Sequence, residues 1–150
     1  MVLTEKILIL FLFILIIIIL IIKLFFHRQV EKIYRHSKKI NTGNLNESLK
    51  FWRSKIGLNK NLIIEVEITN RRDFLLQKMG GAYMKMISPN KKYYIKMYYK
   101  KSNEGVLLHE LSHIKFRHEE LKKRGIKRPF EKEANNNVLR YKLELEKRIS

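Results

Sequence analysis

Cysteine is absent from this chain of 150 residues, and its absence limits how the fold can be held together. Disulfide bonds are excluded, and so are metal sites built from thiolates. Any metal site must therefore use imidazole and carboxylate ligands. The length leaves no room for two full domains, because one domain takes roughly 100 to 200 residues. The sequence contains no internal repeat.

Acidic residues are also scarce, with 14 Asp and Glu against 32 Lys and Arg and a formal net charge of +18. Outside residues 1–26 there are 30 basic and 13 acidic residues, or +17. A charge of this size favours anionic partners such as lipid headgroups or nucleic acid, and it carries no information about the fold. A compositional bias toward Ile, Lys and Asn explains it equally well.

One long apolar run dominates the N-terminal part of the chain. Ile, Leu and Phe continue without interruption from Ile7 to Ile22 and resume after Lys23. About 20 such residues suffice to cross a hydrocarbon core of about 30 Å. A helix of a soluble core would be shorter and would carry a polar stripe. We therefore predict a transmembrane anchor at residues 1–26.

The residues that follow this run indicate whether it is cleaved off and how it is oriented in the membrane. Residues 23–40 lack the small-residue cleavage site of a signal peptide, so we expect the segment to be retained. Basic residues crowd residues 27–44, which we interpret as a juxtamembrane linker that attracts anionic membrane lipid. The excess of positive charge on this side predicts a single-pass membrane protein with its C-terminal domain in the cytoplasm.

Residues 45–150 are predicted to form one α+β domain. Apolar residues at helical spacing predict a helix from Leu45 to Ile56 that stops at Gly57. The alternation of residues between two faces, together with turn signals, predicts three strands. The last two are joined by a hairpin through Ser88-Pro89-Asn90-Lys91. These strands are Leu62–Thr69, Ala82–Ile87 and Lys92–Lys100. Two further helices are expected, from the cap at Ser102 or Asn103 to Arg124 and from Pro129 to Arg148. This order favours helices packed on a three-stranded antiparallel sheet.

The stretch KKYYIKMYYKK, at residues 91–101, interleaves tyrosines with basic residues. Such a strand could form a stacking surface for nucleic acid. Tyrosine is equally a common strand residue without that role, so direct nucleic-acid binding is the less favoured interpretation.

A metal-site motif lies inside the expected helix after Asn103. The segment VLLHELSHI, at residues 106–114, contains HExxH in apolar surroundings. His109 and His113 are four residues apart, so both imidazoles can face one ion from adjacent helical turns. Glu110 lies beside them and could take a proton from a water activated by zinc. We predict His109 and His113 as Zn²⁺ ligands and Glu110 as the general base.

A third protein ligand is expected, because catalytic zinc commonly has three protein ligands and one open position. Glu131 is the best candidate, since a turn at Gly125 would let the last helix pack back against the motif. A glutamate in a first helical turn is also explained by the helix dipole alone. Glu133 is expected on another side of that helix.

Two further side chains complete the predicted site. Asn135 lies one turn after Glu131 and could hydrogen-bond the outer nitrogen of a ligating histidine, although a plain surface amide fits as well. His118 lies nine residues after His109, which would turn it to the opposite side of a continuous helix. We therefore expect His118 to be exposed and not to be a ligand.

The segments VLLHELSHIKFRH and FEKEAN together resemble gluzincin-type metallopeptidases, and most of all the ImmA/IrrE family. That family pairs a HExxH helix with a downstream E-x-E-A-N helix whose first Glu is the third zinc ligand, which by resemblance is Glu131 here. HELSHIKFRH also resembles HtpX-like membrane-bound peptidases. Asn135 departs from the E-x-x-A-D pattern of that group, whereas the hydrophobic anchor is unusual for ImmA/IrrE proteins. The affiliation is open between the two.

The resemblance implies a zincin-like domain that cleaves a protein or peptide substrate, which for ImmA/IrrE proteins is often a regulatory DNA-binding protein. It also implies that strand Lys92–Lys100 is the sheet edge that pairs with an extended substrate. Tyr141 is a conceivable partner for the oxyanion. The leading hypothesis is thus a membrane-anchored zinc endopeptidase. The alternative is a non-catalytic basic membrane protein that uses the same scaffold to bind nucleic acid or anionic lipid.

Overall fold

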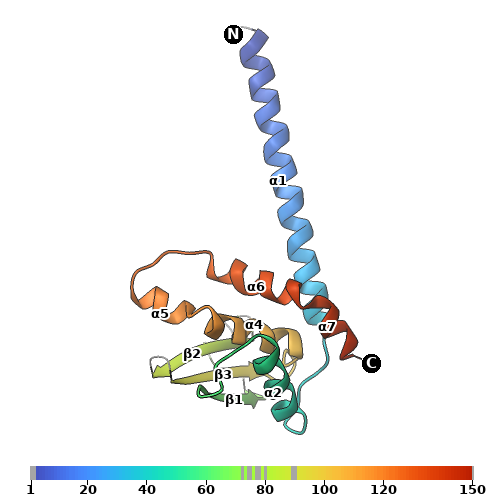
Figure 1. Cartoon of the computed structure of the whole chain (residues 1–150). Helices are drawn as coiled ribbons and strands as arrows, with labels where there is room; N and C mark the ends of the chain where they lie inside the picture. Colours follow the sequence, from blue (N-terminus) through green and yellow to red (C-terminus); the bar gives the residue numbers. More distant parts are fainter. Residues whose placement is uncertain are drawn as a thin grey trace. The chain divides into compact units, whose positions relative to one another are not determined.

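The computed structural model describes residues 3–71, 73, 76, 79, 81–88 and 91–149 (Figure 1). Contacts divide the chain into two compact units, one ending at Lys32 and one beginning at Ile33. The elements in chain order are α1 (Leu3–His36), α2 (Leu45–Lys55), β1 (Ile63–Thr69), β2 (Ala82–Ser88), β3 (Lys92–Tyr98), α4 (Glu104–Lys115), α5 (His118–Lys123), α6 (Phe130–Arg140) and α7 (Lys142–Lys147). The α+β class expected from the sequence is confirmed.

Helix α1 is a single helix of 34 residues. The part from Ile7 to His36 has an apolar window with a mean hydropathy of 3.6, and none of that window is buried. The large side chains from Ile7 to Ile22 are all exposed. By length and composition α1 can cross a membrane, and a signal sequence shares these features.

The sheet has the strand order β1-β3-β2 and is mixed, so the prediction of an antiparallel sheet was wrong. β2 and β3 pair antiparallel, which confirms the hairpin, although its Pro89 and Asn90 lie outside the described residues. β1 pairs in parallel with β3, in a register that places Ile64 opposite Tyr93. The alternation of residues defines each strand, but it does not define which neighbour a strand takes. The chain passes from one edge of the sheet to the other between β1 and β2, and β3 then fills the gap.

The two faces of the sheet have opposite character. Ile64, Tyr93, Ile95 and Met97 are buried in the core. The other face carries basic residues and tyrosines, and carboxylates form ion pairs with the lysines and accept a hydrogen bond from a tyrosine. Lys96 forms ion pairs with Glu67 and Asp73, and Lys92 pairs with Glu65. The Tyr94 hydroxyl donates a hydrogen bond to Glu67. The basic residues and a tyrosine of the predicted stacking strand are thus paired with carboxylates of β1 and of Asp73.

Helix α4 lies on the sheet, and α6 runs back across α4 (Figure 1). Leu107, Leu108 and Leu111 of α4 are fully buried in the core. Asn137 of α6 donates a hydrogen bond of 2.8 Å to the Ser112 hydroxyl of α4. This packing holds the HExxH helix between the sheet and the last part of the chain.

Both C-terminal helices expected from the sequence are divided. The helix expected to run to Arg124 starts as predicted, because the Asn103 side chain accepts a hydrogen bond from the Val106 amide. It ends at Lys115, and α5 follows after Arg117, which has a left-handed backbone with φ of 56°. The last helix begins after Pro129, as predicted, and is interrupted at Tyr141 between α6 and α7.

The residues after Lys32 pack beside the start of α4. Ile33 and Ile40 are buried in the core, so this unit begins upstream of the boundary at residue 45 expected from the sequence. A Cβ atom on Gly105 would lie 2.8 Å from the Ser37 hydroxyl and 3.1 Å from the Tyr34 ring. Only glycine fits without displacing one of them. This close approach brings Tyr34 to the HExxH helix.

Candidate metal centre

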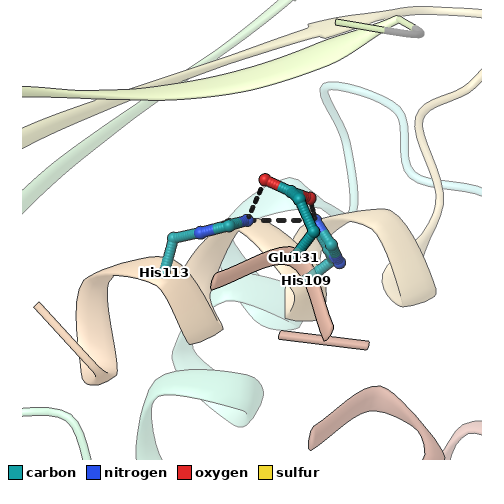
Figure 2. A group of neighbouring side chains, drawn as sticks. All are labelled: His109, His113 and Glu131. Carbon is teal, nitrogen blue, oxygen red and sulfur yellow. Dashed lines mark hydrogen bonds and ion pairs between the residues drawn. The ribbon is translucent and has the colours of Figure 1, made fainter. Parts of the chain in front are cut away.

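Three side chains meet between α4 and α6 (Figure 2). His109 and His113 lie one turn apart on α4, and their Nε2 atoms are 3.1 Å apart. Glu131, in the first turn of α6, places its carboxylate 3.2 Å from His109 Nε2 and 3.6 Å from His113 Nε2. One ligand atom from each of the three residues lies within 4.8 Å of the others. This group could hold a metal ion.

The ligand types and the spacing of the two nitrogens suit a small tetrahedral ion. Zinc binds imidazole nitrogen and carboxylate oxygen at about 2.0–2.2 Å, so two ligand atoms of a tetrahedron lie about 3.3–3.5 Å apart. The two Nε2 atoms are 3.1 Å apart, near that value. The Glu131 carboxylate faces them with its two oxygens, one 3.2 Å from His109 Nε2 and the other 3.6 Å from His113 Nε2, and one ligand atom of each residue lies within 4.8 Å of the others. Two imidazoles and one carboxylate also form a common ligand set of catalytic zinc sites. The donor atoms therefore fit zinc, and other divalent ions accept the same ligands.

Charge complementarity holds the group together. Hydrogen bonds from His109 and then His113 lower the pKa of Glu131 well below its usual range. Burial acts to lower the pKa of His109, but the hydrogen bond to Glu131 and the charge of Glu110 outweigh it and raise the pKa. Glu131 is thus held as a carboxylate, the form that binds a cation, although its side chain is 62% exposed.

Glu110 follows His109 on α4 and is almost fully buried. Burial raises the pKa of its carboxyl, and the nearby His109 and His113 oppose that change. Its side chain lines the same cavity as His109 and Glu131. A group in this position is available to accept a proton from a molecule bound in the cavity.

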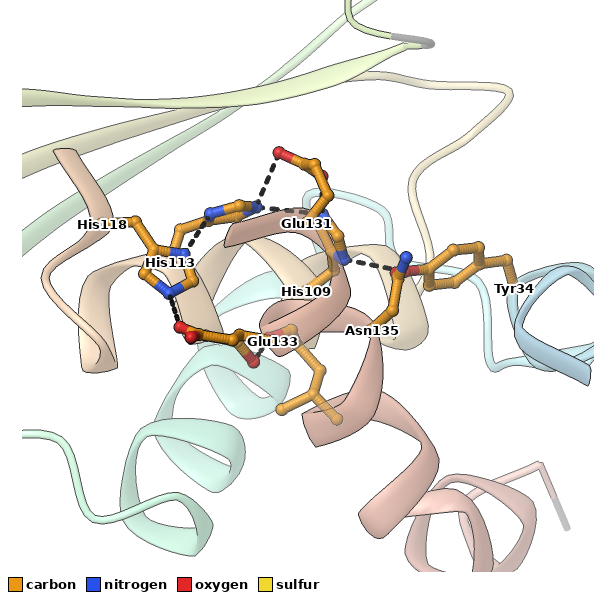
Figure 3. A network of polar contacts seen from close by, with 9 residues as sticks. Tyr34, His109, His113, His118, Glu131, Glu133 and Asn135 are labelled. Atoms are coloured by element: carbon orange, nitrogen blue, oxygen red, sulfur yellow. Dashed lines mark hydrogen bonds and ion pairs between the residues drawn. The ribbon is translucent and has the colours of Figure 1, made fainter. Parts of the chain in front are cut away.

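Tyr34 is part of the site, and sequence reasoning did not find it. Its hydroxyl lies 2.8 Å from His109 Nδ1 and donates a hydrogen bond of 2.8 Å to Asn135 Oδ1 (Figure 3). Because the Tyr34 proton goes to Asn135, the tyrosine oxygen is free to accept the proton of His109 Nδ1, and Nε2 would then offer its lone pair to a bound ion in place of the hydrogen bond to Glu131. The unusual glycine at position 105, in a helical first turn, was the available signal of a close neighbour.

His118 is buried, so the prediction that it is exposed was wrong. Arg117, with its left-handed backbone, interrupts the helix after α4. The direction of His118 therefore cannot be obtained by counting 100° per residue from His109. His118 Nδ1 lies 2.8 Å from His113 Nδ1, and its Nε2 lies 2.9 Å from a carboxylate oxygen of Glu133 (Figure 3). Glu133 does lie on another side of α6 from Glu131, where it contacts His118.

A cavity of about 460 Å³ opens beside the candidate ligands. Besides His109, Glu110, Glu131, Tyr34 and Asn135, its lining includes the start of β2 at Gly81 and Ala82. Four basic side chains also line it: Arg35, Lys39, Lys100 and Lys101. The cavity is thus lined both by two acidic residues, Glu110 and Glu131, and by these four basic side chains.

The expectation that β3 forms the edge of the sheet at this cavity was wrong. β3 has a partner on each side, so the strand at Lys92–Lys100 is not an edge of the sheet. β2 is the edge strand whose first residues reach the cavity. Tyr141 packs against Trp52, and its hydroxyl donates to the Lys55 carbonyl at 3.3 Å. It is not among the residues that line the cavity.

Comparison with protein-family models, with curated proteins and with solved structures finds no match for this chain.

Proposed function

We propose that this chain is a membrane-anchored, zinc-dependent endopeptidase that resembles ImmA/IrrE or HtpX-like metallopeptidases. One observation carries the proposal. The Nε2 atoms of His109 and His113 and the carboxylate of Glu131 converge from two helices, with one ligand atom of each within 4.8 Å of the others, and Glu110 lines the same cavity. Chance placement of a histidine pair on a helix surface does not explain the carboxylate that arrives from α6.

The roles of the residues follow from their positions. Zinc bound by these three ligands would polarise a substrate carbonyl and lower the pKa of water toward about 7. Glu110 takes the proton of the attacking water and passes it to the leaving nitrogen. Tyr34, whose hydroxyl donates to Asn135, holds His109 through its outer nitrogen, so its Nε2 atom stays directed at the ligand position.

The cavity indicates what kind of substrate would fit. β2 is an edge strand, and an extended peptide can add to such an edge through main-chain hydrogen bonds. Arg35, Lys39, Lys100 and Lys101 line the same cavity, which favours acidic side chains near the scissile bond. The substrate is thus an acidic protein segment, and a regulatory DNA-binding protein is one candidate class. Helix α1 would hold the enzyme at the membrane, with its catalytic domain in the cytoplasm.

The alternative function is a non-catalytic membrane protein that binds nucleic acid or anionic lipid. The net charge of +18 supports it. The carboxylates of Glu67 and Asp73, which contact Lys96 and Tyr94 of β3, weaken the case for nucleic-acid binding. They offset the positive charge of the strand that would stack on bases. This alternative predicts binding that falls steeply with salt and does not depend on Glu110.

The proposal is tested with the full chain in detergent micelles. Wild type, Glu110→Gln and a control, Glu119→Gln, are assayed for zinc by elemental analysis and for cleavage of a proteome-derived peptide library by mass spectrometry. We expect one zinc per chain in all three, and a loss of cleavage by about 10²- to 10⁴-fold in Glu110→Gln alone. Cleaved peptides should be enriched in acidic residues. Zinc-loaded wild type that cleaves nothing, or Glu110→Gln with full activity, would overturn the proposal.

A further inference from the structure

His118 and Glu133 form a buried pair that the proposed mechanism does not use. The His118 side chain is 1% exposed and lies between Phe116 and Phe130, and Glu133 is 22% exposed. Both nitrogens of His118 have partners, His113 on one side and Glu133 on the other. A histidine retained only to fill the core would not need both.

The chemistry of the three groups assigns the direction of each hydrogen bond. A carboxylate can only accept, so His118 Nε2 must carry a proton and donate it to Glu133. The neutral imidazole of His118 then has only a lone pair on Nδ1. His113 Nδ1, 2.8 Å away, must therefore donate to it. With its proton on Nδ1, His113 would offer the lone pair of Nε2, the atom that faces His109 and Glu131, to a bound ion.

The far end of this chain is also fixed. Arg128 lies 2.7 Å from the second carboxylate oxygen of Glu133, so the carboxylate has a charged partner that orients it toward His118. The series Arg128, Glu133, His118 and His113 thus runs from the segment before α6 through α5 to the candidate ligand on α4. Every step is a hydrogen bond or ion pair of 2.7–2.9 Å.

We propose that His118 and Glu133 are positioning residues for the metal site: they hold His113 in the tautomer and ring orientation that presents Nε2 to the ion. The inference rests on the metal site of the proposed function. The two ligating histidines are then held by different means, His109 by the tyrosine and amide of Tyr34 and Asn135, and His113 by a second histidine and a carboxylate. Outer partners of this kind usually contribute 10- to 100-fold to metal affinity.

The test uses His118→Phe, which keeps an aromatic ring between Phe116 and Phe130 and removes the acceptor for His113. The zinc dissociation constant of the full chain in detergent is measured by competition with a chelator. We expect His118→Phe to weaken zinc binding by about 10- to 100-fold and Glu133→Gln by about tenfold. Glu119→Gln, on the neighbouring position of α5, should bind as wild type does.

A double variant shows whether Glu133 affects zinc affinity through His118 or independently of it. Because Glu133 acts through His118, Glu133→Gln should have no further effect on zinc affinity in the His118→Phe background. His118→Asn, whose amide oxygen can replace the Nδ1 acceptor, should recover part of the affinity. The tautomer is read directly by long-range ¹⁵N–¹H spectra of the histidine side chains. His113 should carry its proton on Nδ1 in wild type and lose that preference in His118→Phe.

The outcomes distinguish the two proposals. If wild type binds no zinc, the proposed function and this inference fail together. If wild type binds zinc and both His118→Phe and Glu133→Gln bind it equally well, only the inference fails, and His118 is a core residue. If His118→Phe does not fold, Glu133→Gln decides alone, because it changes no aromatic packing.

Discussion

The exposure of Glu131 and its contacts favour different interpretations of its role. Its side chain is 62% exposed, as expected of a glutamate that only answers the dipole of α6, yet it contacts two histidines of another helix. A residue that merely complements a dipole has no need of those contacts. The identity of its ligand atom should therefore matter to the metal site and little to the fold.

We expect Glu131→Gln to weaken zinc binding by more than about 100-fold, beyond the range typical of outer partners, because the neutral amide is a poor ligand. The unfolding temperature of the zinc-free protein should change by only a few degrees. Chelator competition gives the affinity, and the fluorescence of Trp52, the one tryptophan, reports unfolding. Glu119→Gln serves again as the control. Unchanged affinity in Glu131→Gln would place the third ligand elsewhere.

The residues of the site differ in how far the sequence could predict them. His109 and His113 follow from helical geometry alone, because four residues bring them to one side. Glu131 needed the further assumption that two helices pack as a hairpin, and the structure brings it to the histidines. Tyr34 lies 75 residues from His109, and no local pattern joins positions so distant. His118 was placed on the wrong side because a single left-handed residue ended the periodicity on which its placement depended.

At the scale of elements, the break between α4 and α5 turns His118 inward. Arg117 adopts φ of 56°, which is costly for most residues with a Cβ atom and least so for glycine and asparagine. Its guanidinium forms a two-point hydrogen bond with Glu120, but the Arg117 side chain is 52% exposed, so this pair contributes little to stability. The backbone conformation, not the ion pair, is the demanding feature of this turn.

We predict that Arg117→Val destabilises the protein by about 1–2 kcal/mol, because a β-branched residue is the least tolerant of a left-handed backbone. Arg117→Asn also removes the guanidinium but tolerates this conformation, so it should lie within about 0.5 kcal/mol of wild type. Thermal unfolding of the full chain, followed by Trp52 fluorescence, measures both. Equal losses in the two variants would show that the ion pair and not the backbone governs stability here.

The sheet illustrates a second limit of local patterns. Alternating burial in β1 and β3 was predictable, because each strand has one core face. The choice of β3 and not β2 as the partner of β1 depends on where the chain crosses the sheet between Thr69 and Ala82. Apolar alternation in the strands themselves is the same for either neighbour. The mixed sheet therefore could not be read from the strands alone.

At the scale of the whole molecule, the proposed membrane orientation rests on α1 and the basic residues after it. The absence of cysteine makes the orientation testable, because any introduced thiol is unique. Leu143 is 69% exposed and accepts a label in the C-terminal part of the chain. Thr4 precedes the apolar run and lies on the other side of it in the sequence.

In intact cells, a membrane-impermeant maleimide should label Thr4→Cys directly and Leu143→Cys only after permeabilisation, because the proposed topology places the C-terminal domain, on the side of the basic flank, in the cytoplasm. Both variants should remain in the membrane fraction after extraction at high salt and high pH. The reverse labelling pattern would place the catalytic domain outside the cytoplasm. Release of Leu143→Cys into the soluble fraction would show that α1 is not a permanent anchor.

The candidate ligands belong to two helices, and the segment between α4 and α6 is long and partly irregular. Binding of zinc across those helices would favour the folded state over the unfolded one, by about 2.7 kcal/mol when free zinc is 100 times the dissociation constant. The lifetime of the protein would then depend on the supply of metal in its compartment. Chains made during zinc shortage would unfold more often and be degraded sooner, so the abundance of the enzyme would follow zinc availability without any dedicated sensor.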